Sequence, residues 1–116
     1  MLAKQSRLVQ EKDFKKIFKA GKYSHTKIFD IKVLANELEV NRYGIIISTK
    51  VSKKAVERNR LKRQFRSAIK ELDKKIVPGF DLVVIVSWAA KRQKYEFIKS
   101  ELEKILLTLK LFKLSK

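Results

Sequence analysis

The sequence has 116 residues, with 29 lysines and arginines against 12 acids, a net charge of +17 and no cysteine. The absence of cysteine excludes a disulfide framework, a thiol nucleophile and any Cys-ligated metal site. So large an excess of positive charge destabilises a compact chain unless an anionic partner neutralises it. Hydrophobic residues make up 45% of the chain, more than a disordered basic tail contains. We therefore expect one folded domain over residues 1–116 that binds a polyanion.

The N-terminal region predicts a short helix. Phe14, Ile17 and Phe18 follow at helical spacing within Lys12–Gly21, and Gly21 is expected to end the helix in a left-handed conformation. The start of the chain lacks the apolar run of a signal peptide, and no later segment approaches the roughly 20 apolar residues of a membrane span. We expect a cytoplasmic protein with no membrane partner.

Strands are predicted next along the chain. Residues 27–34 alternate between apolar and polar side chains, and residues 43–49 are rich in β-branched residues. The turn residues between these runs indicate an antiparallel hairpin, with one further strand expected around Leu38–Val40.

The second half predicts two helices around a buried strand. An apolar stripe at 3.6-residue spacing predicts a helix over residues 52–74, and Val56, Leu61 and Phe65 are counted in this stripe. The apolar run 81–87 reads as the central strand of a sheet, and residues 95–112 form an amphipathic pattern. The resulting fold class is α+β, or mixed α/β, with helices packed on a small mixed sheet.

The first of these helices is unusually basic. Between Lys50 and Arg66, eight cations stand against the single acid Glu57: Lys50, Lys53, Lys54, Arg58, Arg60, Lys62, Arg63 and Arg66. Like charges four residues apart destabilise a helix by about 0.2–0.5 kcal/mol each, a cost that phosphate groups would reverse. Asn59 can donate to a phosphate or a 2′-hydroxyl group, or it can orient the neighbouring arginines. The segment predicts a nucleic-acid-binding helix.

The same segment resembles the signature helix of the bacterial ribonuclease P protein subunit. The matching motif is Arg58-Asn59-Arg60, followed by Lys62-Arg63 and Arg66. Further matches lie across nearly the whole chain: Asp13-Phe14, Phe18, Gly21, Arg42, Gly44, Lys50, Ala55, Pro78 and Asp81. The resemblance implies an α-β-β-β-α-β-α sandwich with a small mixed central sheet and a left-handed β-α-β crossover.

The resemblance also implies function. The protein would join a catalytic RNA that removes the 5′ leader from precursor tRNA. Its RNA-binding residues would be Lys50, Lys53, Lys54, Arg58, Asn59, Arg60, Lys62, Arg63 and Arg66. Phe14, Phe18 and the exposed sheet face would form a cleft for the leader, although the two rings also fit a purely core role. Lys32 belongs to this cleft, at a position where some members carry an aromatic residue.

Two departures from the family pattern concern the strand ends. Thr49 replaces one of two paired lysines, and Ser87-Trp88 replaces a basic ending of the last strand. We expect Trp88 to pack inside the protein rather than to stack on a base.

The residues do not predict catalysis by the protein itself. A protein nuclease needs clustered carboxylates or a paired histidine, whereas the acids are dispersed and His25 is the only histidine. The resemblance implies that the holoenzyme requires a divalent metal, Mg²⁺, held mainly by the RNA, with no cofactor intrinsic to the protein and no small-molecule cofactor. The alternative is a double-stranded-RNA-binding or other structural RNA-binding protein. A double-stranded-RNA-binding domain would, however, end where another strand and helix are predicted here.

Overall fold

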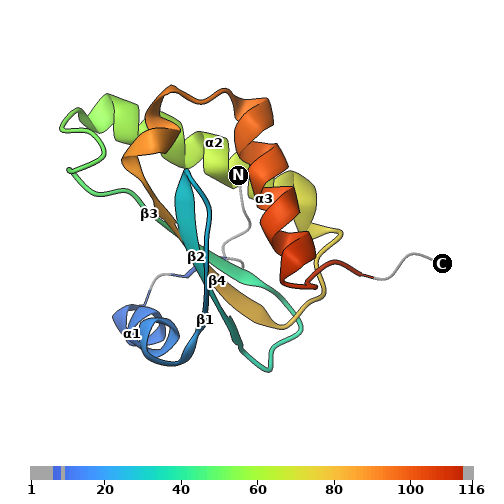
Figure 1. Ribbon diagram of the computed structural model, residues 1–116. Helices are drawn as coiled ribbons and strands as arrows, with labels where there is room; N and C mark the ends of the chain where they lie inside the picture. The colour runs from blue at the N-terminus through green and yellow to red at the C-terminus, as the bar shows by residue number, and fades with distance from the viewer. Residues whose placement is uncertain (1–6, 9, 114–116) are drawn as a thin grey trace.

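The computed structural model describes residues 7–8 and 10–113. Its elements are α1 (Glu11–Ala20), β1 (Lys22–His25), β2 (Phe29–Ala35), β3 (Arg42–Ile46), α2 (Ala55–Asp73), β4 (Phe80–Val86), the 3₁₀ helix η2 (Trp88–Arg92) and α3 (Tyr95–Thr108) (Figure 1). This order confirms the predicted α-β-β-β-α-β-α arrangement. None of the helices in the described part of the chain has the length and apolar character that crossing a membrane requires.

The four strands form one mixed sheet in the order β1-β2-β4-β3. The β1–β2 and β2–β4 pairs are antiparallel, whereas β3 and β4 are parallel. Helix α2 therefore lies in the crossover that joins the parallel neighbours β3 and β4. Strand β4 is central, as its continuous apolar run predicts, because a strand covered on both faces must be apolar on both.

Two strand predictions are wrong. The segments 27–34 and 43–49 do not form a hairpin, because β4 lies between β2 and β3. The hairpin is instead β1–β2. The strand expected at Leu38–Val40 is a loop, in which the Leu38 amide donates to Asn36 Oδ1 at 2.8 Å and Glu37 has a φ of 60°. The Asn36 side chain thus makes a local turn where strand pairing was expected.

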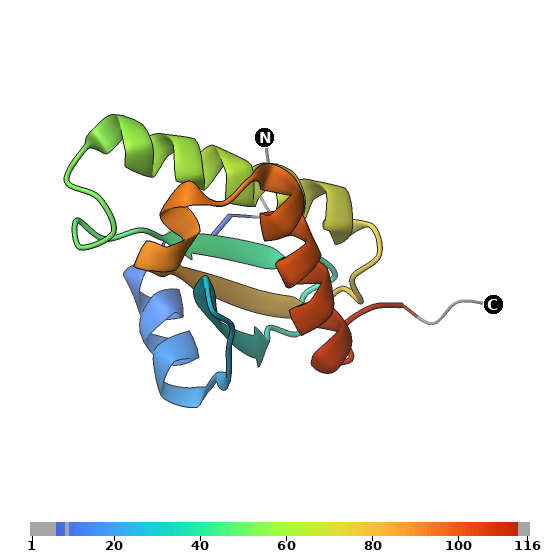
Figure 2. The same cartoon turned by 45° about the horizontal axis from the view of Figure 1, so that its top comes forward.

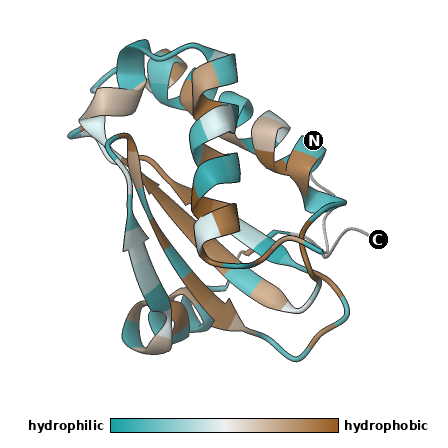
Figure 3. Ribbon diagram, turned by 45° about the vertical axis from the view of Figure 1, so that its right-hand side comes forward, coloured by the Kyte–Doolittle hydropathy of each residue, from teal (hydrophilic) through white to brown (hydrophobic). Residues whose placement is uncertain are grey.

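The helices lie on both faces of the sheet. Helices α2 and α3 cover one face and α1 lies on the other (Figures 1 and 2). The larger core lies under α2 and α3, where the Phe29 and Phe65 rings meet edge to face with centroids 5.9 Å apart. A smaller core of Leu8, Ile17 and Val83 lies under α1. Hydrophobic residues accordingly concentrate along the strands in the middle of the molecule (Figure 3).

The start of α2, the end of α3 and the conformation of Gly21 differ from the prediction. Helix α2 begins at Ala55, and Val56 is 78% exposed, so Val56 does not belong to the apolar stripe. Helix α3 ends at Thr108, because the chain turns at Lys110, where φ is 59°. Gly21 does follow α1, but its φ of −70° is not left-handed. Glycine is required there because a Cβ atom would lie 2.5 Å from the Ile17 carbonyl oxygen.

Candidate nucleic-acid interface

The start of α2 is fixed by the buried residue Ser52. The Lys54 amide donates to Ser52 Oγ at 3.1 Å, and Ser52 Oγ donates to Glu57 Oε1 at 2.6 Å. This hydrogen bond lowers the pKa of Glu57. Arg58 Nη1 donates to the Ser52 carbonyl oxygen at 2.8 Å. The loop before α2 is therefore held to the first turns of the helix, and Arg58 contributes to that contact.

The acids of α2 have partners in neighbouring elements. Glu57 lies 3.6 Å from Lys91 of η2, and Glu71 lies 2.6 Å from Lys99 of α3. Asp73, at the end of the helix, accepts a hydrogen bond from the Tyr43 hydroxyl group. Burial and this bond raise the pKa of Tyr43. Each acid of α2 thus has a partner in another element.

The predicted RNA-binding residues remain at the surface. Lys50, Lys53, Lys54, Asn59, Arg60 and Arg63 are exposed, and Arg58, Lys62 and Arg66 are half-buried. Among the described residues, none of the eight cations of this set forms a salt bridge with a carboxylate. We call these nine residues the basic face. Its charge is not neutralised within the described structure and is available to a polyanion.

Asn59 does not orient its neighbours by hydrogen bonding. The Arg58 guanidinium binds the Ser52 carbonyl, and Arg60 Nη2 donates to the Lys91 carbonyl oxygen at 3.2 Å. Within the described residues no hydrogen bond joins the Asn59 side chain to either arginine. The geometry therefore does not support the role of Asn59 in orienting the neighbouring arginines.

Phe14 lies in a hollow that continues the basic face. The hollow has a volume of about 200 Å³ and is lined by Arg7, Leu8, Phe14, Tyr43, Gly44, Ile45 and Arg66. Gly44 is essential to it, because a Cβ atom there would lie 2.7 Å from the Phe14 ring. Arg66 therefore belongs both to the lining of the hollow and to the basic face.

Phe18 and Lys32 form a second contact on the α1 side of the sheet. Lys32 Nζ donates to the Phe18 carbonyl oxygen at 2.8 Å and lies 5.5 Å from the centroid of the Phe18 ring. The Phe18 side chain is 39% exposed, whereas Ile17 is fully buried. The core role is thus carried by Ile17, and the Phe18 ring is accessible. The structure does not place Phe18 in the same hollow as Phe14.

Motif residues outside α2 have a structural role that the sequence did not reveal. The buried Asp81 accepts two hydrogen bonds from Arg42, at 2.8 and 2.7 Å, and one from Asn36 at 2.8 Å. The bond with Asp81 raises the pKa of Arg42. Arg42 also lies 3.4 Å from Asp13 of α1. This network joins α1, β3 and β4, and the only signal in the sequence is an acid at the start of an apolar strand.

Two other residues are exposed. Trp88 is 66% exposed, so the expectation that it packs inside the protein is wrong. His25 is at the surface and pairs with Asp30. In the part of the chain that the structure describes, no three histidine or acidic side chains come together as a metal-binding group.

The fold and the basic face define a class of protein: a small α+β protein with an exposed basic helix beside a four-stranded mixed sheet. Within this class, the chain belongs to the family described as Ribonuclease P, whose profile matches residues 2–110. Members of this family are the protein component of a tRNA-processing enzyme.

Relatives and solved structures agree with this assignment. The ribonuclease P protein component of Picosynechococcus is 38% identical over 111 residues, covering 96% of each chain. The Synechocystis component is 41% identical over 106 residues, covering 90% of this chain and 85% of its own. The RNase P protein of Staphylococcus aureus superposes with a TM-score of 0.84 at 31% identity, covering 93% of this chain and 98% of its own. The fold is therefore that of bacterial RNase P proteins, and the double-stranded-RNA-binding alternative is not supported.

Proposed function

We propose that this protein is the subunit that binds the catalytic RNA of ribonuclease P through its basic face. The assembled ribonucleoprotein would cut the 5′ leader from precursor tRNA in the cytoplasm by hydrolysing a phosphodiester bond. One observation carries the proposal: Glu57 and Glu71 pair with lysines of η2 and α3, which leaves the basic residues of α2 without acidic partners. This separation of charge favours RNA over a small ligand, because a row of cations matches a row of phosphates.

The role of the protein would be electrostatic. Cations that replace condensed counterions on RNA release those ions, and this release supplies much of the binding free energy. The same neutralisation lowers the repulsion between RNA segments, so the folded RNA requires less divalent metal. The catalytic Mg²⁺ would be held mainly by RNA phosphates, since Mg²⁺ prefers oxygen ligands that include phosphate.

We assign leader binding to the α1 side of the sheet. The accessible Phe18 ring can stack on a base, and the Lys32 ammonium beside it can contact a phosphate. The hollow at Phe14 and Arg66 offers the same combination of ring and cation. Stacking and phosphate contacts accept any base, which suits a leader of variable sequence.

The proposal is tested by reconstitution. The protein alone should cleave nothing, whereas the protein with its cognate ribonuclease P RNA should cleave precursor tRNA at the mature 5′ end in low magnesium. The RNA alone, in the same low magnesium, is the control that isolates the effect of the protein. Absence of any stimulation with an RNA that is active in high magnesium would contradict the proposal. Cleavage by the protein alone would contradict the assignment of catalysis to the RNA.

A further inference from the structure

The 3₁₀ helix η2 exposes the only tryptophan of the chain. Trp88 follows β4 directly, and 66% of its surface is accessible. Large aromatic side chains dominate the energetics of cores and interfaces, and the indole ring offers a flat face for stacking. Its neighbour Ala90 is fully buried, so the turn that carries the ring is anchored in the main core.

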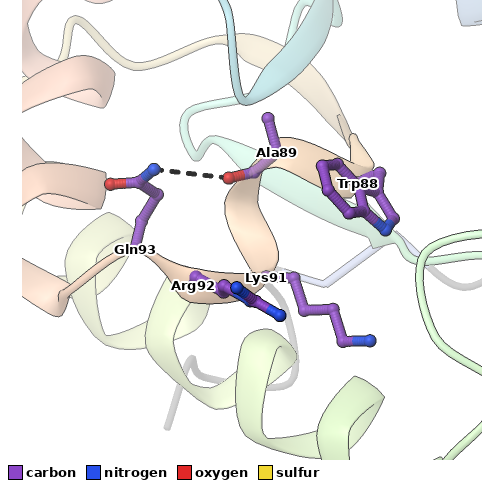
Figure 4. Close-up of a pocket in the computed structure, with 5 residues that line it drawn as sticks. All are labelled: Trp88, Ala89, Lys91, Arg92 and Gln93. Carbon is purple, nitrogen blue, oxygen red and sulfur yellow. Dashed lines mark hydrogen bonds between the residues drawn. The ribbon is translucent and has the colours of Figure 1, made fainter.

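The ring borders a hollow with cations on its rim. The hollow has a volume of about 250 Å³ and is lined by Trp88, Ala89, Lys91, Arg92 and Gln93. Gln93 Nε2 donates to the Ala89 carbonyl oxygen at 3.4 Å and closes one side. Figure 4 shows the side chains of Trp88, Lys91 and Arg92 projecting away from that closed side. The hollow is smaller than the roughly 300–1,000 Å³ of a typical small-molecule pocket, so a single flat ring suits it better than a larger ligand.

This hollow is continuous with the basic face. Lys91 forms a salt bridge with Glu57 of α2, and its carbonyl oxygen accepts the hydrogen bond from Arg60. Arg60 is therefore held between the basic face and η2. A polyanion lying on α2 would meet Trp88, Lys91 and Arg92 as it passes the first half of the helix.

We propose that Trp88 stacks on an unpaired base of the catalytic RNA, while Arg92 contacts a flanking phosphate. This inference rests on the function proposed above and adds a base-stacking site to the basic face. The RNA is favoured over a protein partner because the ring is flanked by cations and is joined to the cationic face of α2. The catalytic RNA is favoured over the leader because Phe18 and Lys32 lie on the α1 side of the sheet, whereas η2 contacts α2.

The single tryptophan makes the site directly observable. Trp88 fluorescence of the full-length protein is measured while the cognate ribonuclease P RNA, a precursor tRNA, or further protein is added. Stacking on the catalytic RNA should quench the emission at stoichiometric RNA, and an equal amount of precursor tRNA should leave it nearly unchanged. Quenching by precursor tRNA alone would overturn the assignment to the catalytic RNA. If Trp88 emission changed with protein concentration in the absence of RNA, the exposed ring would instead be a contact between two copies of this chain, and the RNA-stacking proposal would be wrong.

Variants separate stacking from charge. Stacking on an aromatic side chain contributes enough affinity that Trp88→Ala should weaken binding of the catalytic RNA about 5- to 100-fold. Trp88→Phe should recover much of this loss, and Trp88→Leu should not, because only the aromatic side chain stacks. Leu107→Ala, at a residue 61% exposed on α3, is the matched control and should bind normally. Arg92→Gln should reduce the salt dependence of binding by about one phosphate contact.

The outcomes distinguish this inference from the proposed function. If the wild-type protein binds the catalytic RNA and supports cleavage, but Trp88→Ala binds equally well and Trp88 is not quenched, the stacking site is wrong and the proposed function stands. If the wild-type protein neither binds that RNA nor supports cleavage, both are wrong. If Trp88→Leu and Trp88→Phe bound the catalytic RNA with equal affinity, the contact would be apolar rather than aromatic, and the stacking proposal would be wrong.

Discussion

Asn59 lies between two arginines, each of which donates one hydrogen bond to a backbone carbonyl of the protein. Arg58 donates one hydrogen bond to the Ser52 carbonyl, and Arg60 donates one to the Lys91 carbonyl. A guanidinium group has five N–H donors, so each arginine retains donors for phosphate. Both arginines are thereby held in place on the helix surface. Asn59 is exposed, and among the described residues its side chain makes no hydrogen bond to a backbone carbonyl, so its amide is free to contact RNA.

We predict that Asn59→Ala and Asn59→Lys both weaken binding of the catalytic RNA about threefold to tenfold, the effect of losing one net hydrogen bond. Neither variant should change the free energy of unfolding appreciably, because the side chain is exposed. Equilibrium binding and urea unfolding measure the two effects. Ser100→Ala, an exposed residue of α3, is the control. Tighter binding of Asn59→Lys would show that the motif acts through charge alone.

Helix α2 has different partners on different sides. Leu61, Phe65 and Leu72 are buried against the sheet and α3. The acids Glu57 and Glu71 meet lysines of the neighbouring elements, and the basic residues remain outside. The bond from Lys99 lowers the pKa of Glu71, and the same bond raises the pKa of Lys99. The link between α2 and α3 is therefore electrostatic as well as apolar.

The pKa of Glu71 predicts a pH dependence of stability. Because the folded pKa lies below the ordinary value of 4.5, the contribution of this carboxylate is complete above pH 4.5 and is lost as the pH falls through the folded value. Glu71→Gln should therefore be less stable than wild type near neutral pH, and the gap should shrink on acidification. The effect should be small, since the pair is partly exposed. Urea unfolding at several pH values measures it, with Glu39→Gln, at an exposed residue of the loop between β2 and β3, as control. A gap that stays constant with pH would contradict the assignment.

Elements were easier to predict than their pairing. The long apolar pattern of α2 and the continuous apolar run of β4 identify both elements, because local periodicity reports burial. Strand partners depend on the whole topology. Proximity in sequence predicts that β3 pairs with β2, whereas β4, from the far end of the crossover, lies between them. Likewise, the basic face could be predicted from charge density, whereas the Arg42–Asp81 network and the exposure of Trp88 depend on contacts between distant segments.

At the scale of the whole molecule, the surfaces proposed for RNA and for leader differ in position. The basic face lies on and next to α2, which η2 contacts. Phe18 belongs to α1 and is bonded by Lys32, and α1 lies on the other face of the sheet (Figures 1 and 2). Arg66 belongs to the basic face and also lines the Phe14 hollow. In the proposed arrangement, one small protein binds the catalytic RNA on the α2 side and adds contacts to the substrate leader on the α1 side.

This arrangement predicts selective loss of substrate binding. Phe18→Ala should weaken binding of leader-bearing precursor tRNA by the reconstituted holoenzyme about 5- to 100-fold, because one stacking contact is lost. Binding of mature tRNA should not change. Phe97→Ala is closely matched, since Phe97 is 40% exposed and Phe18 is 39% exposed. Equal losses for precursor and mature tRNA would place the effect on the assembly rather than on the leader.

The salt dependence of affinity for the catalytic RNA tests the basic face most directly. Contact with about six phosphates gives a slope of log affinity against log salt of about −4 to −5. Lys62 and Arg63 are better targets than Arg58 and Arg60, whose side chains also hold the protein structure together. Replacing both Lys62 and Arg63 by alanine should reduce the magnitude of the slope by about 1–2. Replacing Lys104 and Lys113, outside the basic face, should leave it unchanged. An unchanged slope for the Lys62 and Arg63 double variant would contradict the assignment of RNA binding to α2.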